Sequence, residues 1–390
     1  MKKSIIFFSL SLFISVQTSA QLTIKKIKPS TTDATISTFD ADSNFVYLNQ
    51  GIPAKNLLLI HLLGTFGEPK RATLFGSLAA NLGFHSIGLM YPNVPTVGSF
   101  CTNNTDLTCF ENVRREIIEG LDYSPEISIQ QNEAIYNRIK KLLSYLSTNY
   151  PSENWSQYLN ESGEVNWEKV IVSGHSQGGG HAALMGKLFP LKRVLCFSSP
   201  KDWNNTIDNV PPWVGSENWA MDKSNVFVFN HLLDEHEQQL VIWDSLGLNS
   251  SGPSVNVETM NPPYSNTRQL VTNYNVNTGD EHASTIQDNK TPKVNLIPVF
   301  EPVWTYMLTF DLLAELPTNK SDKFVISPNP TNDFIYIPSD FMNSTISIVD
   351  ISGKELLQSF NTEKIDVSNL KNGYYYLVID RIYTYKILKN

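Results

Sequence analysis

Short apolar runs alternate with amphipathic stretches from residue 57 to about residue 275. Continuously apolar runs are typical of strands buried on both faces of a parallel sheet, and the stretches between them have helical spacing. We expect strands at 57–60, 86–90, 170–172, 193–197, 226–229 and 269–275, and helices at 72–82, 130–147 and 181–188. This alternation predicts an α/β domain around a mostly parallel central sheet, which we place at residues 21–316.

The pattern changes after about residue 316. Residues 317–323 are polar and have the composition of a linker, and helical periodicity disappears beyond them. Short strands are expected at 334–337, 345–349, 364–367, 374–379 and 383–388, with turn signals at 352–354 and 371–373. This spacing predicts a separate small all-β sandwich at residues 324–390.

The first 20 residues have the order of a secretory signal peptide. Lys2 and Lys3 precede an apolar run from Ile5 to Val16, and small and polar residues follow at 17–20. The alternative, an N-terminal membrane anchor, requires a longer apolar run. We therefore expect residues 1–20 to be removed, and no later segment has 18 uninterrupted apolar residues.

Composition narrows the class of protein. The chain has 390 residues, 41% of them hydrophobic and 17% charged, which suits two folded domains. Its net charge of -8 argues against a nucleic-acid partner. Cys101 and Cys109 lie in a loop-like stretch where we favour a disulfide over two free thiols, and Cys196 lies in an apolar run typical of a buried thiol.

One glycine-rich segment carries candidate chemistry. Residues 174–178 read G-H-S-Q-G, follow an apolar strand and open a helix, which is the strand-turn-helix setting of a nucleophile elbow. Ser176 is therefore the candidate nucleophile. The alternative is a glycine-rich turn with an incidental serine.

A serine nucleophile needs a base and an acid. Of the seven histidines, His282 alone lies on a loop after the last core strand, as the order Ser, acid, His requires. The acid should follow the preceding strand, where Asp234 is the leading candidate, Glu235 the close alternative and Asp202 a more distant one. His231 and His236 lie nearby, but no metal-ligand spacing is present, so we expect neither a metal nor a cofactor.

Two backbone N–H groups are expected to hold a developing oxyanion. Gln177, at the start of the helix, supplies one. The turn at 61–69 supplies the other, where Leu63 is the best candidate and Gly64 the next.

Substrate contacts are expected from two segments. One is the cysteine loop with Arg114 and Arg115, and the other spans residues 202–225 with Trp203, Trp213 and Trp219. The tryptophans could stack on sugar or aryl groups, or form the core of a small cap.

These residues resemble the α/β-hydrolase superfamily over about residues 21–316. The likeness rests on G-H-S-Q-G-G-G, the turn at 61–69 and the order Ser176, Asp234, His282. The chain is most similar to a secreted bacterial subgroup with an H-x-x-G-T-x-G-x-P turn and a cysteine pair before a V-R-x-E stretch, here 113–116. The subgroup likeness implies no particular substrate.

The C-terminal part resembles the type A sorting domain of the type IX secretion system of Bacteroidetes. The likeness rests on S-P-N-P at 327–330, the segment 348–354, the segment 365–375 and the lysine-bearing end 386–389. It implies recognition by the type IX machinery and export through the periplasm of a Gram-negative bacterium. The product would be secreted or held at the cell surface. An ordinary β-sandwich binding module is the alternative.

Together these features predict a secreted serine hydrolase that forms an acyl-enzyme on a carbohydrate-linked, lipid or small ester. A serine peptidase of the same fold is one alternative. A non-catalytic surface protein that retains the hydrolase fold as a binding module is another.

Overall fold

The computed structural model describes residues 22–312 and, beyond them, residues 326–337, 341, 344–350, 355–360, 362–379 and 383–390. The predicted signal peptide at 1–20 and the predicted linker at 317–323 lie outside these ranges. The domain boundaries that depend on them therefore stay predictions.

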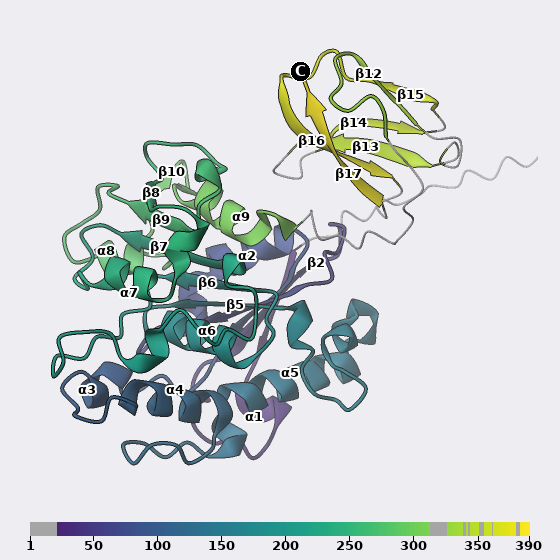
Figure 1. The fold of residues 1–390 in the computed structure, drawn as a ribbon. Helices are drawn as coiled ribbons and strands as arrows, with labels where there is room; N and C mark the ends of the chain where they lie inside the picture. The colour runs from purple at the N-terminus through teal and green to yellow at the C-terminus, as the bar shows by residue number, and fades with distance from the viewer. Residues whose placement is uncertain are drawn as a thin grey trace, which may run out of the picture.

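A nine-stranded sheet organises the larger part of the chain (Figure 1), with the strand order β1-β2-β4-β3-β5-β6-β7-β9-β8. The strands are β1 (Leu22–Ile27), β2 (Asn44–Asn49), β3 (Leu58–Leu62), β4 (His85–Leu89), β5 (Val170–His175), β6 (Arg193–Phe197), β7 (Val226–His231), β8 (Val255–Asn256) and β9 (Gln269–Thr272). β2 pairs antiparallel with β1 and β4, and all the other pairs are parallel. The mostly parallel sheet confirms the α/β prediction.

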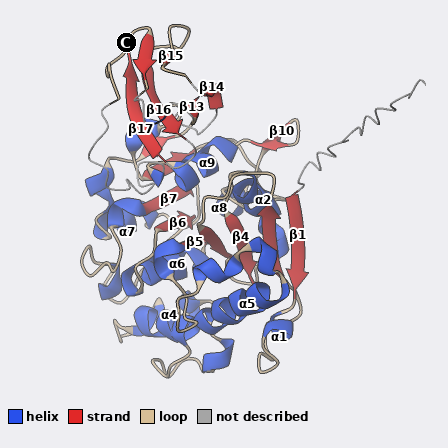
Figure 2. Ribbon diagram, turned by 90° about the vertical axis from the view of Figure 1, so that its right-hand side faces the viewer, coloured by secondary structure: helices blue, strands red, loops and turns tan. Residues whose placement is uncertain are grey.

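Helices cover both faces of this sheet (Figure 2). They are α1 (Pro29–Thr32), α2 (Thr73–Asn81), α3 (Val97–Cys101), α4 (Cys109–Glu119), α5 (Ile135–Asn149), α6 (Gln177–Leu188), α7 (Gln239–Ser245), α8 (Glu281–Ser284) and α9 (Glu301–Thr309). α4, α5 and α6 contribute to one hydrophobic core, and α2 and α9 contribute to a second core. A hairpin of two short strands, β10 (Lys293–Val294) and β11 (Ile297–Pro298), precedes α9.

Successive residues of a strand point to opposite faces of the sheet and therefore belong to different cores. In β3, Leu58, Ile60 and Leu62 belong to the first core and Leu59 to the second, and all four side chains are fully buried. A strand with apolar residues on both faces requires cover on both sides. The continuous apolar runs of the sequence therefore dictate the three-layer arrangement.

The C-terminal part is an antiparallel β region. β12 (Phe334–Tyr336) pairs with β15 (Lys364–Asp366), and a four-stranded sheet has the order β14-β13-β16-β17. The strands of the second sheet are β13 (Thr345–Val349), β14 (Glu355–Phe360), β16 (Gly373–Ile379) and β17 (Tyr383–Lys389). Buried residues from both sheets share one apolar cluster, so the region has its own core.

Several elements were not predicted from the pattern. β1, β2, β8, β14, α4 and α9 are absent from the expected list, and α6 begins at Gln177, four residues before the predicted start. Gly178, Gly179 and Gly180 have low helix propensity. Contacts with the sheet and with neighbouring loops nevertheless hold them in the helix.

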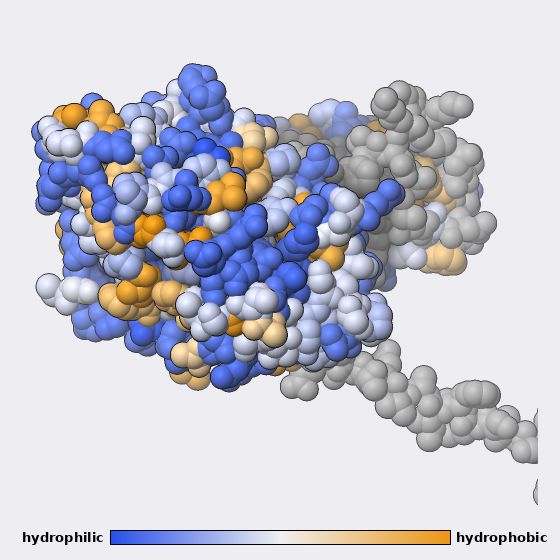
Figure 3. All heavy atoms as spheres, turned by 90° about the horizontal axis from the view of Figure 1, so that it is seen from below, coloured by the Kyte–Doolittle hydropathy of each residue, from blue (hydrophilic) through white to orange (hydrophobic). Residues whose placement is uncertain are grey.

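Apolar side chains form only small separate patches on the face seen in Figure 3, which is otherwise hydrophilic. No helix among the residues that the structure covers is long and apolar enough to cross a membrane.

Candidate active site

Ser176 lies at the junction of β5 and α6, at the carboxyl edge of the parallel strands. Its backbone has φ 54° and ψ -120°, outside the regions that a serine ordinarily occupies. The Ser176 N–H donates a hydrogen bond to the Phe197 carbonyl of β6, with N and O 2.9 Å apart. The surrounding structure therefore maintains a strained turn, and such strain is concentrated at functional sites.

Glycines make this turn possible. A Cβ atom on Gly174 would lie 2.2 Å from the Gly178 backbone, and one on Gly178 would lie 2.1 Å from the Leu62 carbonyl oxygen. A Cβ on Gly64 would lie 2.9 Å from the Ser176 Cβ, so the turn after β3 packs directly against the candidate nucleophile. Side chains at these positions would force the strand, the helix and the turn apart.

The structure brings His282 and Asp234 together. His282 Nδ1 lies 2.7 Å from Asp234 Oδ2, and the His236 backbone N–H donates to Asp234 Oδ1 over 3.0 Å. Burial raises the pKa of the Asp234 carboxyl, but its hydrogen bonds and the nearby imidazoles outweigh this effect and leave the pKa below its ordinary value. Asp234 is therefore ionised and fixes the imidazole with its proton on Nδ1. His282 Nε2 is buried and makes no hydrogen bond within the described part of the chain, so its lone pair can accept a proton.

The two alternative acids lie elsewhere. The Glu235 side chain is 74% exposed, and the carboxylate of Asp202 pairs with Arg114. Of the three acids considered, Asp234 is the one that contacts His282.

His175, directly before Ser176, contacts both the backbone and the ring of His282. Its Nε2–H donates to the His282 carbonyl oxygen over 2.9 Å, and the two ring centroids are 4.9 Å apart. Complete burial, reinforced by the neighbouring imidazole of His282, holds the pKa of His175 well below its ordinary value. His175 is therefore a neutral group that positions the base next to the nucleophile. The sequence motif contains this residue but gave no sign of this contact.

Asp234, His236 and His282 also meet the distance requirement for a metal site, because their potential ligand atoms lie within 4.8 Å of one another. The ammonium of Lys201 lies 2.8 Å from His236 Nε2, and Asp234 accepts the hydrogen bond from His282. A cation already in contact with one ligand repels a divalent ion. The three side chains therefore suit a metal poorly.

The turn expected to supply an oxyanion donor is firmly held. The Tyr91 hydroxyl donates to the Leu63 carbonyl, and Asn93 Nδ2 donates to the carbonyls of Gly64 and Gly67 over 3.2 and 2.8 Å. These bonds occupy carbonyl oxygens of the turn. They leave the role of the Leu63 N–H as a prediction.

The Gln177 side chain contributes an interaction that the sequence did not suggest. Its Oε1 accepts hydrogen bonds from the Val97 N–H at 2.9 Å and the Thr65 hydroxyl at 3.1 Å, while Nε2 donates to the Asn93 carbonyl at 3.2 Å. The residue after Ser176 thus ties the loops after β3 and β4 to the start of α6. Its backbone N–H begins the helix, where donors have no partner within the helix.

The expectation that Arg114 and Trp213 contact substrate is corrected by their burial. Arg114 is 1% exposed and forms two hydrogen bonds with Asp202, of 2.7 and 2.5 Å. It also donates to the Gln177 carbonyl over 3.0 Å, and Trp213 Nε1 donates to Asp202 over 2.9 Å. Both side chains support the elbow from inside the protein. Trp203 is half-buried, packs against the first core and donates to Asp208.

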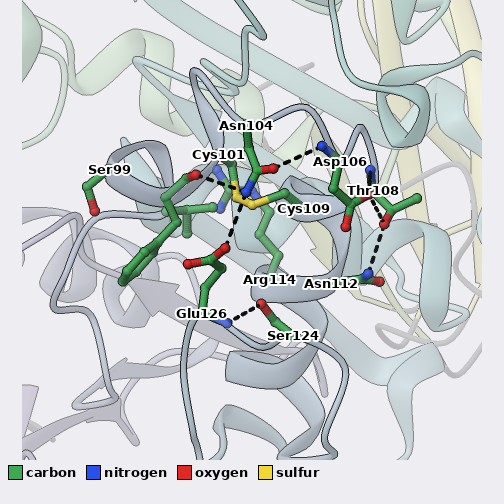
Figure 4. The surroundings of a disulfide bond; sticks show 12 residues. Ser99, Cys101, Asn104, Asp106, Thr108, Cys109, Asn112, Arg114, Ser124 and Glu126 are labelled. Carbon is green, nitrogen blue, oxygen red and sulfur yellow. Dashed lines mark hydrogen bonds between the residues drawn. A yellow bond between two sulfur atoms is a disulfide. The ribbon is translucent and has the colours of Figure 1, made fainter. Parts of the chain in front are cut away.

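Cys101 and Cys109 form a disulfide, as the sequence favoured, and Cys196 is a buried free thiol. The bridge joins α3 to the start of α4 (Figure 4). Asn104 lies between the two cysteines, and its side chain contacts the Phe100 carbonyl, the Asp106 N–H and Glu126. Hydrogen bonds of Asn104 therefore support the disulfide loop from within.

This loop is joined to the segment after β6 by a row of hydrogen bonds. Asn204 Nδ2 donates to the Asn104 carbonyl over 2.9 Å, and the Asn205 N–H donates to the Thr102 carbonyl over 2.7 Å. The two segments expected to form the substrate wall thus lie against each other.

A cavity of about 500 Å³ lies at the opposite edge of the sheet, among residues 48–56, 83–85 and 152–157. His85 is the imidazole in its lining. Both of its ring nitrogens are occupied, by the Tyr158 hydroxyl and the Glu153 carbonyl, each at 2.8 Å. The cavity lacks the acid and base pairing found beside Ser176, so we place the candidate chemistry at the elbow.

Residues 325–389 match the family model of the secretion system C-terminal sorting domain. No curated protein matches the chain. The sorting domain indicates interaction with the type IX secretion machinery. In Bacteroidetes, such a domain marks a protein that is exported and is then either secreted or attached at the cell surface.

Proposed function

We propose that this chain is an exported serine hydrolase of the α/β-hydrolase superfamily that cleaves carboxylic esters. The observation that carries the proposal is the backbone of Ser176, held at φ 54° between β5 and α6 beside the hydrogen-bonded His282–Asp234 pair. The sheet order supports it as well. The candidate nucleophile follows β5, the acid follows β7 and the base follows β9, so all three lie on loops at the same edge.

The proposed reaction has two halves. Ser176 Oγ attacks the ester carbonyl while His282 Nε2 takes its proton, and Asp234 stabilises the imidazolium that forms. The N–H groups of Gln177 and Leu63 bind the oxyanion. Collapse of the intermediate releases the alcohol with the proton from His282, and water then cleaves the acyl-enzyme by the same route in reverse.

The absence of a Ser176–His282 hydrogen bond is compatible with this scheme. Contacts of this kind are often long in an enzyme without substrate and tighten when the substrate binds. The His175 contact keeps the His282 loop next to the elbow in the meantime.

A fluorophosphonate probe tests the proposal directly, because it labels only an activated serine. We expect the full chain to be labelled, Ser176→Ala to be unlabelled, and Asp234→Asn to be labelled roughly 10⁴-fold more slowly. Ser162→Ala is a suitable control, because Ser162 is exposed and lies in a loop away from the elbow.

Labelling of wild type that persists in Ser176→Ala, or no labelling at all, would refute the serine hydrolase. A panel of aryl esters and chromogenic peptides then separates an esterase from a peptidase. We expect turnover of the esters.

A further inference from the structure

Lys201 is a cation beside the candidate active site that the proposed mechanism does not use. It follows β6 by four residues and is partly buried. Its Nζ lies 2.8 Å from His236 Nε2, and the His236 ring centroid is 5.1 Å from that of His282. The ammonium therefore lies one side chain away from the proposed base.

No carboxylate forms a close ion pair with this ammonium among the residues that the structure describes. Burial lowers the pKa of Lys201, and the charges of Asp234, Glu235 and Asp202 partly offset this effect from farther away. The neighbouring acids are committed elsewhere, because Asp202 binds Arg114 and Asp234 binds His282. Glu235 Oε1 lies 3.4 Å from His236 Nε2, and the Glu235 side chain is mostly exposed.

The hydrogen-bond partner of Lys201 is itself uncharged. Burial, together with the positive charge of Lys201, lowers the pKa of His236 to about 4. His236 is therefore neutral near pH 7 and accepts a hydrogen bond from the ammonium. An ammonium has three donors, so two remain for another group.

A partly buried ammonium without a carboxylate in direct contact is costly to maintain for stability alone. It is favourable where an anionic ligand completes the pair. The chain as a whole carries a net charge of -8, which repels anions at long range. An anionic substrate would thus depend on a local cation such as this one.

We infer that Lys201 forms a subsite for an anionic group of the substrate, so that the enzyme favours esters with a carboxylate or a similar anion a few bonds from the scissile carbonyl. The inference rests on the proposed serine hydrolase. The anion takes no part in bond making or breaking. It orients the ester between Ser176 and His282, and the other two donors of Lys201 bind it.

The experiment compares two esters of one shape and different charge. Monophenyl glutarate carries a carboxylate, and phenyl 4-carbamoylbutanoate replaces that group with a neutral amide. Release of phenol gives kcat/KM for each with the full chain. A charge-assisted hydrogen bond predicts a preference for the carboxylate of roughly 10- to 100-fold.

Substitutions test whether Lys201 causes the preference for the carboxylate ester. In Lys201→Met we expect the ratio of the two kcat/KM values to fall close to one, and in Lys201→Arg we expect most of it to remain. Lys141→Met is the control and should keep the wild-type ratio, because Lys141 lies on α5 and pairs with Asp33.

The outcomes separate the two proposals. Failure of fluorophosphonate labelling at Ser176 overturns the hydrolase itself. Normal labelling with equal turnover of both esters by wild type overturns the anion subsite alone, and this measurement needs no variant that must fold. A Lys201→Met enzyme that keeps the carboxylate preference, or loses the same factor on both esters, also overturns it.

Discussion

Arg114→Met removes one half of an ion pair that lies behind the nucleophile elbow. The side chains of Arg114 and Asp202 are each 2% exposed, so the substitution leaves a buried carboxylate whose remaining hydrogen bond comes from Trp213. It also removes the donor to the Gln177 carbonyl. The prediction therefore concerns both stability and the geometry of the site.

The magnitude follows from this burial. Breaking a buried ion pair by removing one partner costs about 3 to 5 kcal/mol, because the other charge is left uncompensated. For a domain of this size each kcal/mol lowers the Tm by about 2 °C, so we expect a fall of about 6 to 10 °C. The next residue provides the control. Arg115 forms a partly exposed pair with Glu119, and such a pair contributes about 0.3 to 0.5 kcal/mol. Arg115 also donates to the Tyr123 hydroxyl, but no buried charge is left behind, so Arg115→Met should lower the Tm much less than Arg114→Met.

Thermal unfolding of both variants, with ester turnover measured well below the Tm, is the assay. A double-mutant cycle with Asp202→Asn refines it, since the double variant should lose less than the sum of the two single losses. Equal Tm values for Arg114→Met and Arg115→Met would contradict the buried role. A raised KM without loss of stability would instead return Arg114 to the substrate contacts that the sequence suggested.

Three further predictions follow from the site and its surroundings. Gly64→Ala should abolish ester turnover while the fold survives, because the new Cβ meets Ser176 at 2.9 Å; Gly215→Ala, where the nearest atom is 3.5 Å away, should be active. Replacing both Cys101 and Cys109 with serine should lower the free energy of unfolding by about 2.5 kcal/mol from loop entropy, as denaturant titration would measure, and an unchanged midpoint would contradict this. Five histidines have pKa values below their ordinary 6.5, chiefly through burial: His61, His85, His175, His181 and His236. Below pH 6.5 the unfolded chain therefore binds more protons than the folded chain. The contribution of these histidines to stability is complete above that pH and falls by up to roughly 7 kcal/mol per pH unit in acid. A Tm that stays flat from pH 8 to pH 5 would refute this.

The contacting acid and base could be found from sequence because strand order fixes where the strands end. Continuous apolar runs revealed β5 and β7, and a more polar run revealed β9. Parallel strands deliver the residues after them to the same edge. Asp234 and His282 are 48 residues apart in the chain, yet this reasoning placed them together, and the structure has them 2.7 Å apart.

Contacts that depend on side-chain direction could not be found in this way. Arg114 and Asp202 are 88 residues apart, and nothing in their neighbourhoods shows that both point inward. An arginine beside a cysteine loop has the same sequence appearance whether it faces substrate or core. The Gln177 side chain and the His175 contact were missed for the same reason. Short or polar edge strands such as β1 and β8 lack the apolar runs that revealed the central strands.

Several features that lower local stability lie together at the carboxyl edge of the parallel strands. Ser176 adopts a positive φ, and the first turn of α6 contains glycines. Within the described residues, His282 Nε2 is buried without a hydrogen bond, and the ammonium of Lys201 contacts an imidazole and no carboxylate directly. Each feature lowers stability, and a sequence shaped for stability alone would remove them separately, since they lie on the segments after β5, β6 and β9. Their concentration at one edge of the sheet is an argument for function there that is independent of the motif. It also predicts that substitutions such as Lys201→Met will raise the Tm while they reduce activity on anionic esters, which links the anion subsite to a measurement that requires no substrate.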